Sequence, residues 1–496
     1  MIFERVKHSD FFASVISLEH MTTARMLTLR KFLHWRALKL LIILSTMAFV
    51  TLALLQYQQK LKRPARARWR TVMESSSECV APVKELGCAV PAFTAEWSTV
   101  PSLDIQIYSA HIDDRLVVDG EIQNFIRIIG LLRKSATQVR LYCLANYPSG
   151  EQTTARATLD KVWIDSWDNA THKDLLTPYI ISCHIGADLQ EQPSGVSILT
   201  DPCECPSNNL RLRRQMPPPR RDFMVCVKGL FFSRDKSREL MQWLEMLYLL
   251  GAKHIHMYNY LLHKKTKKML KFYQRYRNLT LQKISLPPRE YPQGMGFLKN
   301  FLVNKAWEKR RLELVPYNDC YYQYKDKFDY ITLLDVDELI VPRDLDATSW
   351  PTLMHKIRDV EAEAVSKYAS FAFSNAYFFR DKDSPMDILV QTQRSANLSR
   401  PGFAVKSFFT ANGSLAVFNH YTLIPLRPEI RKCAIVGSDI GLVHHYRDSC
   451  PQLMEKECEN DFMKFVIKDD TVPKKFARRL HQALEAVTHD MKNALF

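Results

Sequence analysis

The sequence predicts an α/β protein in which a mainly parallel-sheet domain follows a small β-rich domain and a single transmembrane helix. Three observations lead to this prediction. Strands and helices alternate after residue 222, as they do in parallel sheets. Residues 99–205 instead hold short apolar runs separated by turn residues, which is typical of β-structure. Residues 40–55 are an apolar run without a formal charge, which is typical of a membrane helix.

The bulk composition fits two folded domains with tails. The chain has 496 residues, and 46% of them are hydrophobic, which is enough for packed cores. The net charge of +16 is uneven, because residues 1–70 hold 13 Lys or Arg against 3 Asp or Glu. The rest of the chain therefore carries only +6. Since the motifs of nucleic-acid-binding domains are also missing, we expect no nucleic-acid partner.

The apolar run predicts a signal-anchor over residues 37–55, after a cytoplasmic tail at 1–36 and before a stem at 56–98. A cleaved signal peptide and a buried core helix are the alternatives. The residues that follow, Gln56 to Lys60, form a poor cleavage site, and charged residues flank the run on both sides. Because these flanking charges are nearly balanced, they do not fix the orientation of the span.

Sequons and cysteines favour a lumenal location for the part of the chain after the anchor. Acceptor sequons for N-glycans begin at Asn169, Asn278, Asn397 and Asn412. The 11 cysteines match no zinc template and are expected to form disulfides, with buried free thiols as the alternative. Local pairs are predicted for Cys79 with Cys88 and for Cys450 with Cys458. Cys203 and Cys205 are too close for an easy mutual bond and are expected to pair elsewhere.

The β-rich domain is predicted at 99–205 and is followed by a Pro- and Arg-rich linker at 206–221. Its expected strands are Leu103–Tyr108, Gln138–Leu144 and Tyr179–His184. The spacing of apolar residues predicts one helix in this domain, around Ile122–Leu132.

The α/β domain is predicted at 222–470, with a C-terminal helix at 471–496. Strands and helices are expected to alternate in it, and Gly251 is well placed to end the first helix. The expected strands are Phe223–Val227, His254–Tyr258, Leu279–Ile284 and Tyr330–Leu334, and the expected helices are Lys236–Leu250, Lys264–Arg277 and Gly296–Leu314.

The chemistry is expected where the strand Tyr330–Leu334 runs into Asp335-Val336-Asp337. Open α/β sheets bind ligands at the carboxyl ends of their strands. Two carboxylates at positions i and i+2 can face one ion there, and their hard oxygen atoms suit Mg²⁺ or Mn²⁺. A diphosphate would complete the shell, and the ion would neutralise charge on that leaving group. Glu338 is a further ligand, an acid/base group or a structural carboxylate.

Several separate motifs occur in one order along the chain. They are Tyr108–Arg115, Ile126–Gly130, Cys226–Phe231, Trp243–Glu245 with Leu249–Gly251, Asn318–Cys320 and His444–Arg447. With Asp335–Asp337, they resemble glycosyltransferase family 92, a group of GT-A-fold inverting galactosyltransferases. The resemblance covers residues from about Ile107 to Arg447.

This resemblance implies transfer of galactose from UDP-galactose with inversion, in the presence of a divalent metal, usually Mn²⁺. Animal members resemble β-1,4-galactosyltransferases that extend fucose or galactose on N-glycans, and plant relatives act on cell-wall galactan. With the predicted anchor, the sequons and the cysteines, we expect a single-pass type II protein of the Golgi membrane, with a lumenal catalytic domain.

The resemblance also suggests roles for particular residues. Metal ligands are expected at Asp335, Asp337 and His445, with His444 as the alternative histidine. The donor is expected to contact Asp335 and five further residues, Lys228, Asn259, Asn318, Asp319 and Lys406. Of these, Lys228 and Asn259 lie at predicted strand ends, and a solvated lysine is the alternative for Lys406. Asp439 and Glu338 are the candidates for the catalytic base. The usual acidic residue after the second strand is replaced by Tyr258-Asn259-Tyr260, which leaves the uridine contacts open.

Two functions of other classes remain as alternatives. A catalytically inactive GT-A-like scaffold could bind glycans or proteins in the lumen, but it has no need of intact Asp335 and Asp337. A non-catalytic Ca²⁺-binding protein would require denser carboxylate loops than the single Asp335–Glu338 segment.

Overall fold

The computed structural model describes residues 87–494, except for 95, 168–174, 188, 214–220, 345, 381–384 and 451–454. The chain divides between residues 71 and 72, and all the described residues belong to the second part. The predicted tail and anchor, almost all of the predicted stem, and the positions of Cys79 and Asn169 lie outside the described residues. Within the described part of the chain, no helix is long and apolar enough to cross a membrane.

Residues 98–213 form an eight-stranded sheet of order β1-β2-β3-β6-β5-β4-β7-β8. Because β8 also pairs with β2, the sheet closes on itself and leaves few free edges. An apolar core that includes Ile126, Ile128 and Ile181 fills it. The strands are β1 Ser98–Val100, β2 Ile105–Val118, β3 Glu121–Leu132, β4 Tyr142–Asn146, β5 Gln152–Lys161, β6 Thr177–Gly186, β7 Gly195–Leu199 and β8 Leu210–Arg213.

Two predictions for this region differ from the structure. The helix expected around Ile122–Leu132 is wrong, because this segment is strand β3. Its residues from Phe125 to Leu132 are all buried, since β3 lies between β2 and β6 with side chains covered on both faces. A continuous apolar run of this kind does not distinguish a buried strand from a helix. The predicted linker at 206–221 also contains a strand, Leu210–Arg213.

The central sheet has seven strands in the order β11-β10-β9-β12-β17-β14-β20. Four of its strands are parallel, namely β9 Arg221–Phe232, β10 Ala252–Leu262, β11 Leu279–Lys283 and β12 Phe328–Leu333. The remaining three are β17 Lys406–Thr410, β14 Ser370–Phe373 and β20 Ala434–Ile435. Strand β17 is antiparallel to both β12 and β14. The predicted alternation of strands and helices is therefore confirmed for β9 to β12.

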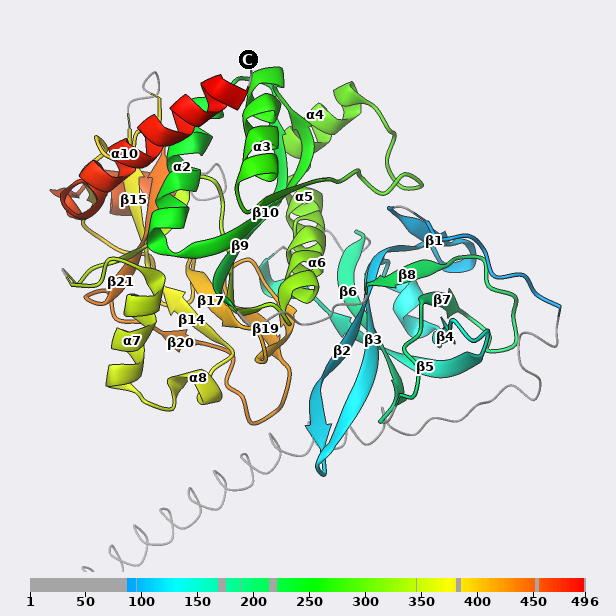
Figure 1. Cartoon of the computed structure of the whole chain (residues 1–496). Helices are drawn as coiled ribbons and strands as arrows, with labels where there is room; N and C mark the ends of the chain where they lie inside the picture. Colours follow the sequence, from blue (N-terminus) through cyan, green and yellow to red (C-terminus); the bar gives the residue numbers. More distant parts are fainter. Residues whose placement is uncertain are drawn as a thin grey trace, which may run out of the picture. The chain divides into compact units, whose positions relative to one another are not determined.

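Helices cover both faces of this sheet (Figure 1). On β9, Phe223, Val225 and Val227 face a core built with α2 (Ser237–Leu250), α3 (Lys264–Tyr276) and α10 (Thr471–Ala494). Met224 and Cys226 alternate with them and face a second core. That core contains α4 (Met295–Asn304), α5 (Ala306–Leu312) and α6 (Leu314–Tyr324). Alternate residues thus enter two cores, as in a sheet buried on both sides.

The helix boundaries follow local signals. Gly251 ends α2 with a positive φ of 112°, and its amide donates to the carbonyl groups of Leu247 and Tyr248, as expected of a glycine C-cap. The single helix expected over Gly296–Leu314 is divided instead, since α4 ends before Lys305 and α5 begins after it.

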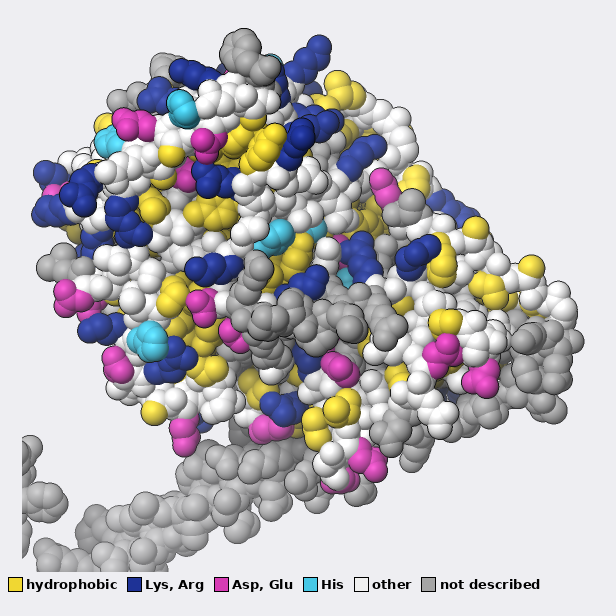
Figure 2. Space-filling model, in the orientation of Figure 1, with side chains coloured by type: hydrophobic (Ala, Val, Ile, Leu, Met, Phe, Trp, Pro, Cys, Tyr) yellow, Lys and Arg dark blue, Asp and Glu magenta, His cyan; other side chains and the backbone are white. Residues whose placement is uncertain are grey.

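A five-stranded sheet and a hairpin complete the described fold. The sheet consists of β13 Glu338–Pro342, β21 Gly441–Arg447, β15 Asn375–Phe379, β16 Gln393–Ser395 and β22 Val466–Lys468, in this order. The hairpin is β18 Ser414–Val417 with β19 Thr422–Pro425. The remaining helices are α7 Trp350–Val360, α8 Ala364–Lys367 and α9 Glu455–Glu457. On the face shown in Figure 2, basic side chains are spread among acidic and apolar ones.

Four disulfides lie within the described residues, and one cysteine there, Cys433, is free. The pairs are Cys88–Cys205, Cys143–Cys183, Cys226–Cys320 and Cys450–Cys458. The predicted local pair Cys450–Cys458 is confirmed. The predicted pair Cys79–Cys88 is wrong, because β7 and β8 bring Cys205 to Cys88 from 117 residues away.

We expect N-glycans at Asn278, Asn397 and Asn412, because all three side chains are exposed and each begins a sequon. Protein from a secretory host should lose mass on treatment with peptide N-glycosidase F, and single Asn→Gln variants should each remove one glycan step on a gel. Mobility unchanged by the enzyme would contradict passage of this part of the chain through the lumen.

Candidate functional site

The Asp335–Glu338 turn lies directly beyond the carboxyl end of β12 and leads into β13. Two hydrogen bonds close it. The amide of Glu338 donates to the carbonyl of Asp335 at 3.0 Å, and the amide of Asp335 donates to the Glu338 carboxylate at 2.9 Å. The Glu338 side chain therefore fixes the backbone that carries both aspartates.

Two lysines from neighbouring strands hold the Asp335 carboxylate. Lys228 Nζ, from β9, lies 3.0 Å from Asp335 Oδ1, and Lys406 Nζ, from β17, lies 3.3 Å from Oδ2. The hydroxyl of Tyr317 on α6 donates to Oδ1 at 3.3 Å. Burial alone would raise the pKa of Asp335, but the two lysines outweigh it and hold this pKa well below its usual range.

Each lysine also contacts a second carboxylate. Lys406 Nζ is 3.0 Å from Glu338 Oε2, and Lys228 Nζ is 3.2 Å from Glu313 Oε2. The Lys406 side chain is 1% exposed, whereas Lys228 is 24% exposed. Lys228 is therefore the lysine of this pair that is more open to a bound anion.

Asp337 points away from the lysines and lies beside a histidine. Its Oδ2 is 3.5 Å from Nε2 of His445, which comes from β21, the strand that pairs with β13. The second ring nitrogen, Nδ1, lies 3.0 Å from the amide of Asn375 on β15 and 3.5 Å from Glu338 Oε1. Burial alone would raise the pKa of Asp337, but His445 contributes most to lowering it. Asp337 remains 37% exposed and accessible to a ligand.

These side chains form part of the wall of one cavity of about 1040 Å³. Lys228, Glu313, Asp335, Asp337, Glu338, Lys406 and His445 all line it. Aromatic side chains line it too, and two of these, Trp163 and Trp167, come from the segment after β5 of the eight-stranded sheet. Its size and mixed polar and aromatic lining are typical of a small-molecule site.

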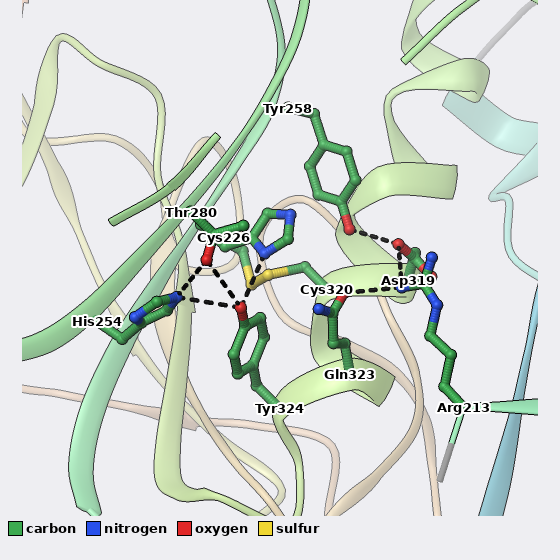
Figure 3. Close-up of a disulfide and its surroundings, with 10 residues drawn as sticks. Arg213, Cys226, His254, Tyr258, Thr280, Asp319, Cys320, Gln323 and Tyr324 are labelled. Carbon is green, nitrogen blue, oxygen red and sulfur yellow. Dashed lines mark hydrogen bonds and ion pairs between the residues drawn. A yellow bond between two sulfur atoms is a disulfide. The ribbon is translucent and has the colours of Figure 1, made fainter. Parts of the chain in front are cut away.

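Helix α6, which supplies Tyr317, is fixed by a buried ionic cluster and a disulfide (Figure 3). Asp319 is 0% exposed and lies between the two sheets. Its carboxylate is 3.0 Å from His111 Nε2 on β2, 3.3 Å from Arg213 Nη1 on β8, and accepts a 2.5 Å hydrogen bond from Tyr258 on β10. The next residue, Cys320, is bonded to Cys226 of β9. The eight-stranded sheet thus helps to position α6.

The comparisons with known proteins identify the family. Residues 221–488, more than half of the chain, match the family described as glycosyltransferase family 92. The chain belongs to glycosyltransferase family 92. Membership in this family and the mixed α/β fold make it a glycosyltransferase by class.

The similarity to solved structures is weaker than the match to the family. The crystal structure of S. aureus TarS 1–349 is 10% identical, with a TM-score of 0.23, over 45% of this chain and 60% of that one. Its complex with UDP-GlcNAc is 9% identical, with the same TM-score, over 47% of this chain and 60% of that one. The chain thus spans about 60% of the length of these structures, and the similarity is too low to support a functional argument. No curated protein matches the chain.

The cavity brings together six of the residues that the sequence predicts for the site. Lys228, Asp335, Asp337, Glu338, Lys406 and His445 line one cavity. Of the alternatives left open for Glu338, the structural carboxylate fits its bonds to the Asp335 amide and Lys406. His444 is fully buried and its ring stacks on Phe378, so of these two histidines it is His445 that lies beside Asp337.

Four other predicted residues lie elsewhere. Asn259 donates to the carbonyl of Gln282, and Asn318 bonds to the backbone at Leu314 and Val417, so both serve the fold. Asp319 is enclosed in the cluster between the sheets. Asp439, the suggested base, is exposed before the start of β21, whereas His445 lies four residues, or about 13 Å of strand, beyond that start. None of the four lines the cavity, so we do not assign them to donor or base.

The residues around Asp337 supply some, but not all, of the ligands that a divalent metal ion needs. No group of three or more His, Cys, Asp and Glu side chains in the described ranges has a metal-binding arrangement. Asp337 Oδ2 and His445 Nε2, however, are 3.5 Å apart, close to the separation of about 3 Å for adjacent ligands with bonds of about 2.1 Å. A donor diphosphate and water would supply the other ligands, as is common for such ions.

The buried Oδ1 of Asn375 supports this arrangement, since it has no hydrogen-bond partner. Rotation of the Asn375 amide would let this oxygen accept from Nδ1–H of His445. That bond would leave the Nε2 lone pair free for a metal, and metal-bound histidines usually donate their other N–H in this way.

Sequence reasoning missed Tyr317, Glu313 and Asn375. Glu313 and Tyr317 are four residues apart at the start of α6, and this i, i+4 spacing is the signal that could have placed both on one face toward β9. Asn375 has no local signal, because only the pairing of β15 with β21 brings it to His445.

Proposed function

We propose that this protein is a metal-dependent inverting glycosyltransferase that moves galactose from UDP-galactose to a galactose or fucose of N-glycans, in a β-1,4 linkage. One observation carries the proposal. Asp335 and Asp337 lie beyond the carboxyl end of β12, on the wall of a large cavity, with His445 beside Asp337. The family supports the transfer of a sugar, and the galactose donor and the N-glycan acceptor follow from the motif resemblance described above.

The charges at the site favour a cation together with the donor. Three carboxylates, those of Asp335, Glu338 and Glu313, lie beside two lysines, Lys228 and Lys406. A fourth, that of Asp337, lies beside His445. A nucleotide diphosphate would add further negative charge. A divalent ion such as Mn²⁺ held by Asp337 and His445 would neutralise this charge and act as a Lewis acid on the leaving diphosphate.

The chain's own residues bind and orient the donor. Lys228 is held toward Asp335 and Glu313 but remains partly exposed, so its ammonium group can also contact a phosphate oxygen. Lys406, buried between Asp335 and Glu338, keeps the turn in place. In an inverting transfer the acceptor hydroxyl attacks C1 of the sugar, its proton passes to a base, and UDP leaves with the electrons of the C1–O bond.

The disulfides support a secretory compartment. Four disulfides in the described part of the chain require an oxidising environment, because disulfides are rare in the cytosol. We therefore propose a Golgi membrane protein of type II orientation, anchored through residues 37–55, with the catalytic part in the lumen.

A donor and acceptor screen tests the proposed function. The purified full chain should be incubated with UDP-galactose, UDP-glucose, UDP-GlcNAc and UDP-GalNAc, with and without Mn²⁺. The acceptors should be N-glycans that end in galactose or carry fucose. We expect transfer from UDP-galactose alone, lost with a chelator and restored by Mn²⁺, and linkage analysis should show a β-1,4 bond. No transfer from any donor would refute the enzymatic proposal, and metal-independent transfer would refute the metal site.

A further inference from the structure

Four side chains form an aromatic wall on one side of the cavity, namely Trp163, Trp167, Phe418 and His420. Trp167 ends the short helix η3 (Asp165–Trp167). Its ring lies 4.9 Å from that of Phe418 and 5.4 Å from that of His420. Trp163 lies 6.1 Å from Phe418. Both tryptophans precede the segment that matches the family, whereas Phe418 and His420 belong to it.

The wall offers two polar groups without use in the described fold. Trp163 is 6% exposed, and its buried Nε1–H has no hydrogen-bond acceptor within the described residues. Buried donors of this kind normally have a partner, and the Trp163 side chain also lines the cavity. His420 donates from Nδ1 to the carbonyl of Val405 at 2.7 Å. Its other nitrogen, Nε2, then carries the lone pair and can accept a hydrogen bond.

The imidazole of His420 is neutral around pH 7. Burial and the nearby charge of Lys406 lower the pKa of His420 to about 3. A neutral ring keeps the Nε2 lone pair available across the physiological range.

Two residues of the wall, Phe418 and His420, follow β17 and so belong to the side of Asp335 that is opposite to the expected nucleotide position. A nucleotide is expected at the carboxyl ends of the parallel strands β9 and β10, where Lys228 contacts Asp335. On the other side of β12 is β17, where Lys406 contacts both Asp335 and Asn419, at 3.3 and 2.9 Å. His420 follows Asn419 directly. The aromatic wall is therefore on the side from which a second substrate can reach the donor sugar.

We propose that the aromatic wall binds the acceptor sugar, with Trp167 against the apolar face of the ring and His420 Nε2 accepting a hydrogen bond from a hydroxyl. This inference rests on the proposed function. A pyranose has an apolar C–H face and a polar edge, and an aromatic surface beside a hydrogen-bond acceptor matches both. Because Trp163 and Trp167 precede residue 221, the eight-stranded sheet and its connections contribute to acceptor choice.

Trp167→Ala tests the stacking contact. We expect the KM for the N-glycan acceptor to rise about tenfold, as removal of a large aromatic contact surface would produce. The KM for UDP-galactose and the rate of its hydrolysis without acceptor should stay within about twofold. Phe93→Ala is the matched control, because Phe93 is an aromatic residue that is 40% exposed and does not line the cavity. It should leave all of these constants unchanged.

His420→Asn tests the hydrogen bond. The asparagine amide can still donate to the Val405 carbonyl, but the acceptor at the Nε2 position is lost. We expect kcat/KM for the acceptor to fall about tenfold, which corresponds to the loss of one buried hydrogen bond, while the Tm and the KM for UDP-galactose stay the same.

The outcomes separate this inference from the proposed function. If Trp167→Ala raises the KM for UDP-galactose instead, the wall belongs to the nucleotide site and the inference is wrong. It is equally wrong if neither variant changes any constant. If the wild type transfers no sugar, the proposed function fails. Equilibrium binding of the same N-glycans, measured by tryptophan fluorescence, then tests the acceptor site alone. Binding by the wild type but not by Trp167→Ala supports the proposed role of the aromatic wall. No binding by the wild type refutes it.

Discussion

Asp337→Asn is expected to lower kcat/KM for sugar transfer by about 10³-fold. This substitution keeps the shape of the side chain but removes the charge that would face the metal beside His445. A Lewis-acid ion stabilises a transition state by several kcal/mol, and about 4 kcal/mol corresponds to about 10³ in rate. The measurement is steady-state kinetics with UDP-galactose over a range of Mn²⁺ concentrations, together with the Tm of each variant.

A matched control is available for this variant. Asp470 is 34% exposed, close to the 37% of Asp337, and pairs with Lys474 away from the cavity. Asp470→Asn should leave kcat/KM within about twofold. A Tm of Asp337→Asn close to that of the wild type would exclude misfolding as the cause. If Asp337→Asn keeps more than a tenth of the wild-type activity at equal Mn²⁺, the assignment of Asp337 as a metal ligand is wrong.

The second large effect is expected at Asp319. Replacing it with alanine removes the anion at the centre of the cluster and leaves His111, Arg213 and Tyr258 without their shared partner. Breaking a buried ionic pair typically costs about 3–5 kcal/mol, so we expect a loss of stability of this size in denaturant unfolding. Activity should fall as well, because the same helix places Tyr317 at Asp335.

The pH dependence of stability gives an independent test at this residue. Burial alone would raise the pKa of Asp319, but Arg213 and His111 outweigh it and hold the pKa well below its usual range. A depressed pKa stabilises the fold above the unfolded value near 4, and this contribution is lost as the pH falls below it. Asp319→Asn should therefore flatten the loss of stability below about pH 5. Asp165→Ala, at the exposed Lys161 pair, should not.

The sequence was most informative where function and local pattern coincide. A hydrophobic strand that ends in two aspartates is visible without any tertiary knowledge, and the structure places Asp335 and Asp337 at the expected sheet edge. The parallel strands β9 to β12 were predictable for the same reason, since their periodicity and turn residues are local signals. His445 was predicted as a metal ligand only through the family resemblance, because no local sequence pattern indicates this role.

Long-range pairing accounts for most of what could not be predicted. Residues 122–132 have apolar spacing compatible with a helix, and only their two neighbouring strands make them a strand. Asp319 stands next to a family motif and so suggested a donor contact, yet its partners lie about 100 and 200 residues away. Trp163 and Trp167 reach the cavity through the packing of one sheet against another, which no local pattern encodes.

The buried carboxylate of Asp319 limits how the two parts of this chain can be separated in evolution. Its partners His111 and Arg213 precede residue 221, while the helix that carries it follows. A version of the chain that begins at residue 221 would keep the anion and lose both partners, so it should fold poorly although it contains the entire family segment. The two parts are therefore expected to be inherited as a unit, with neither free to recombine with an unrelated neighbour.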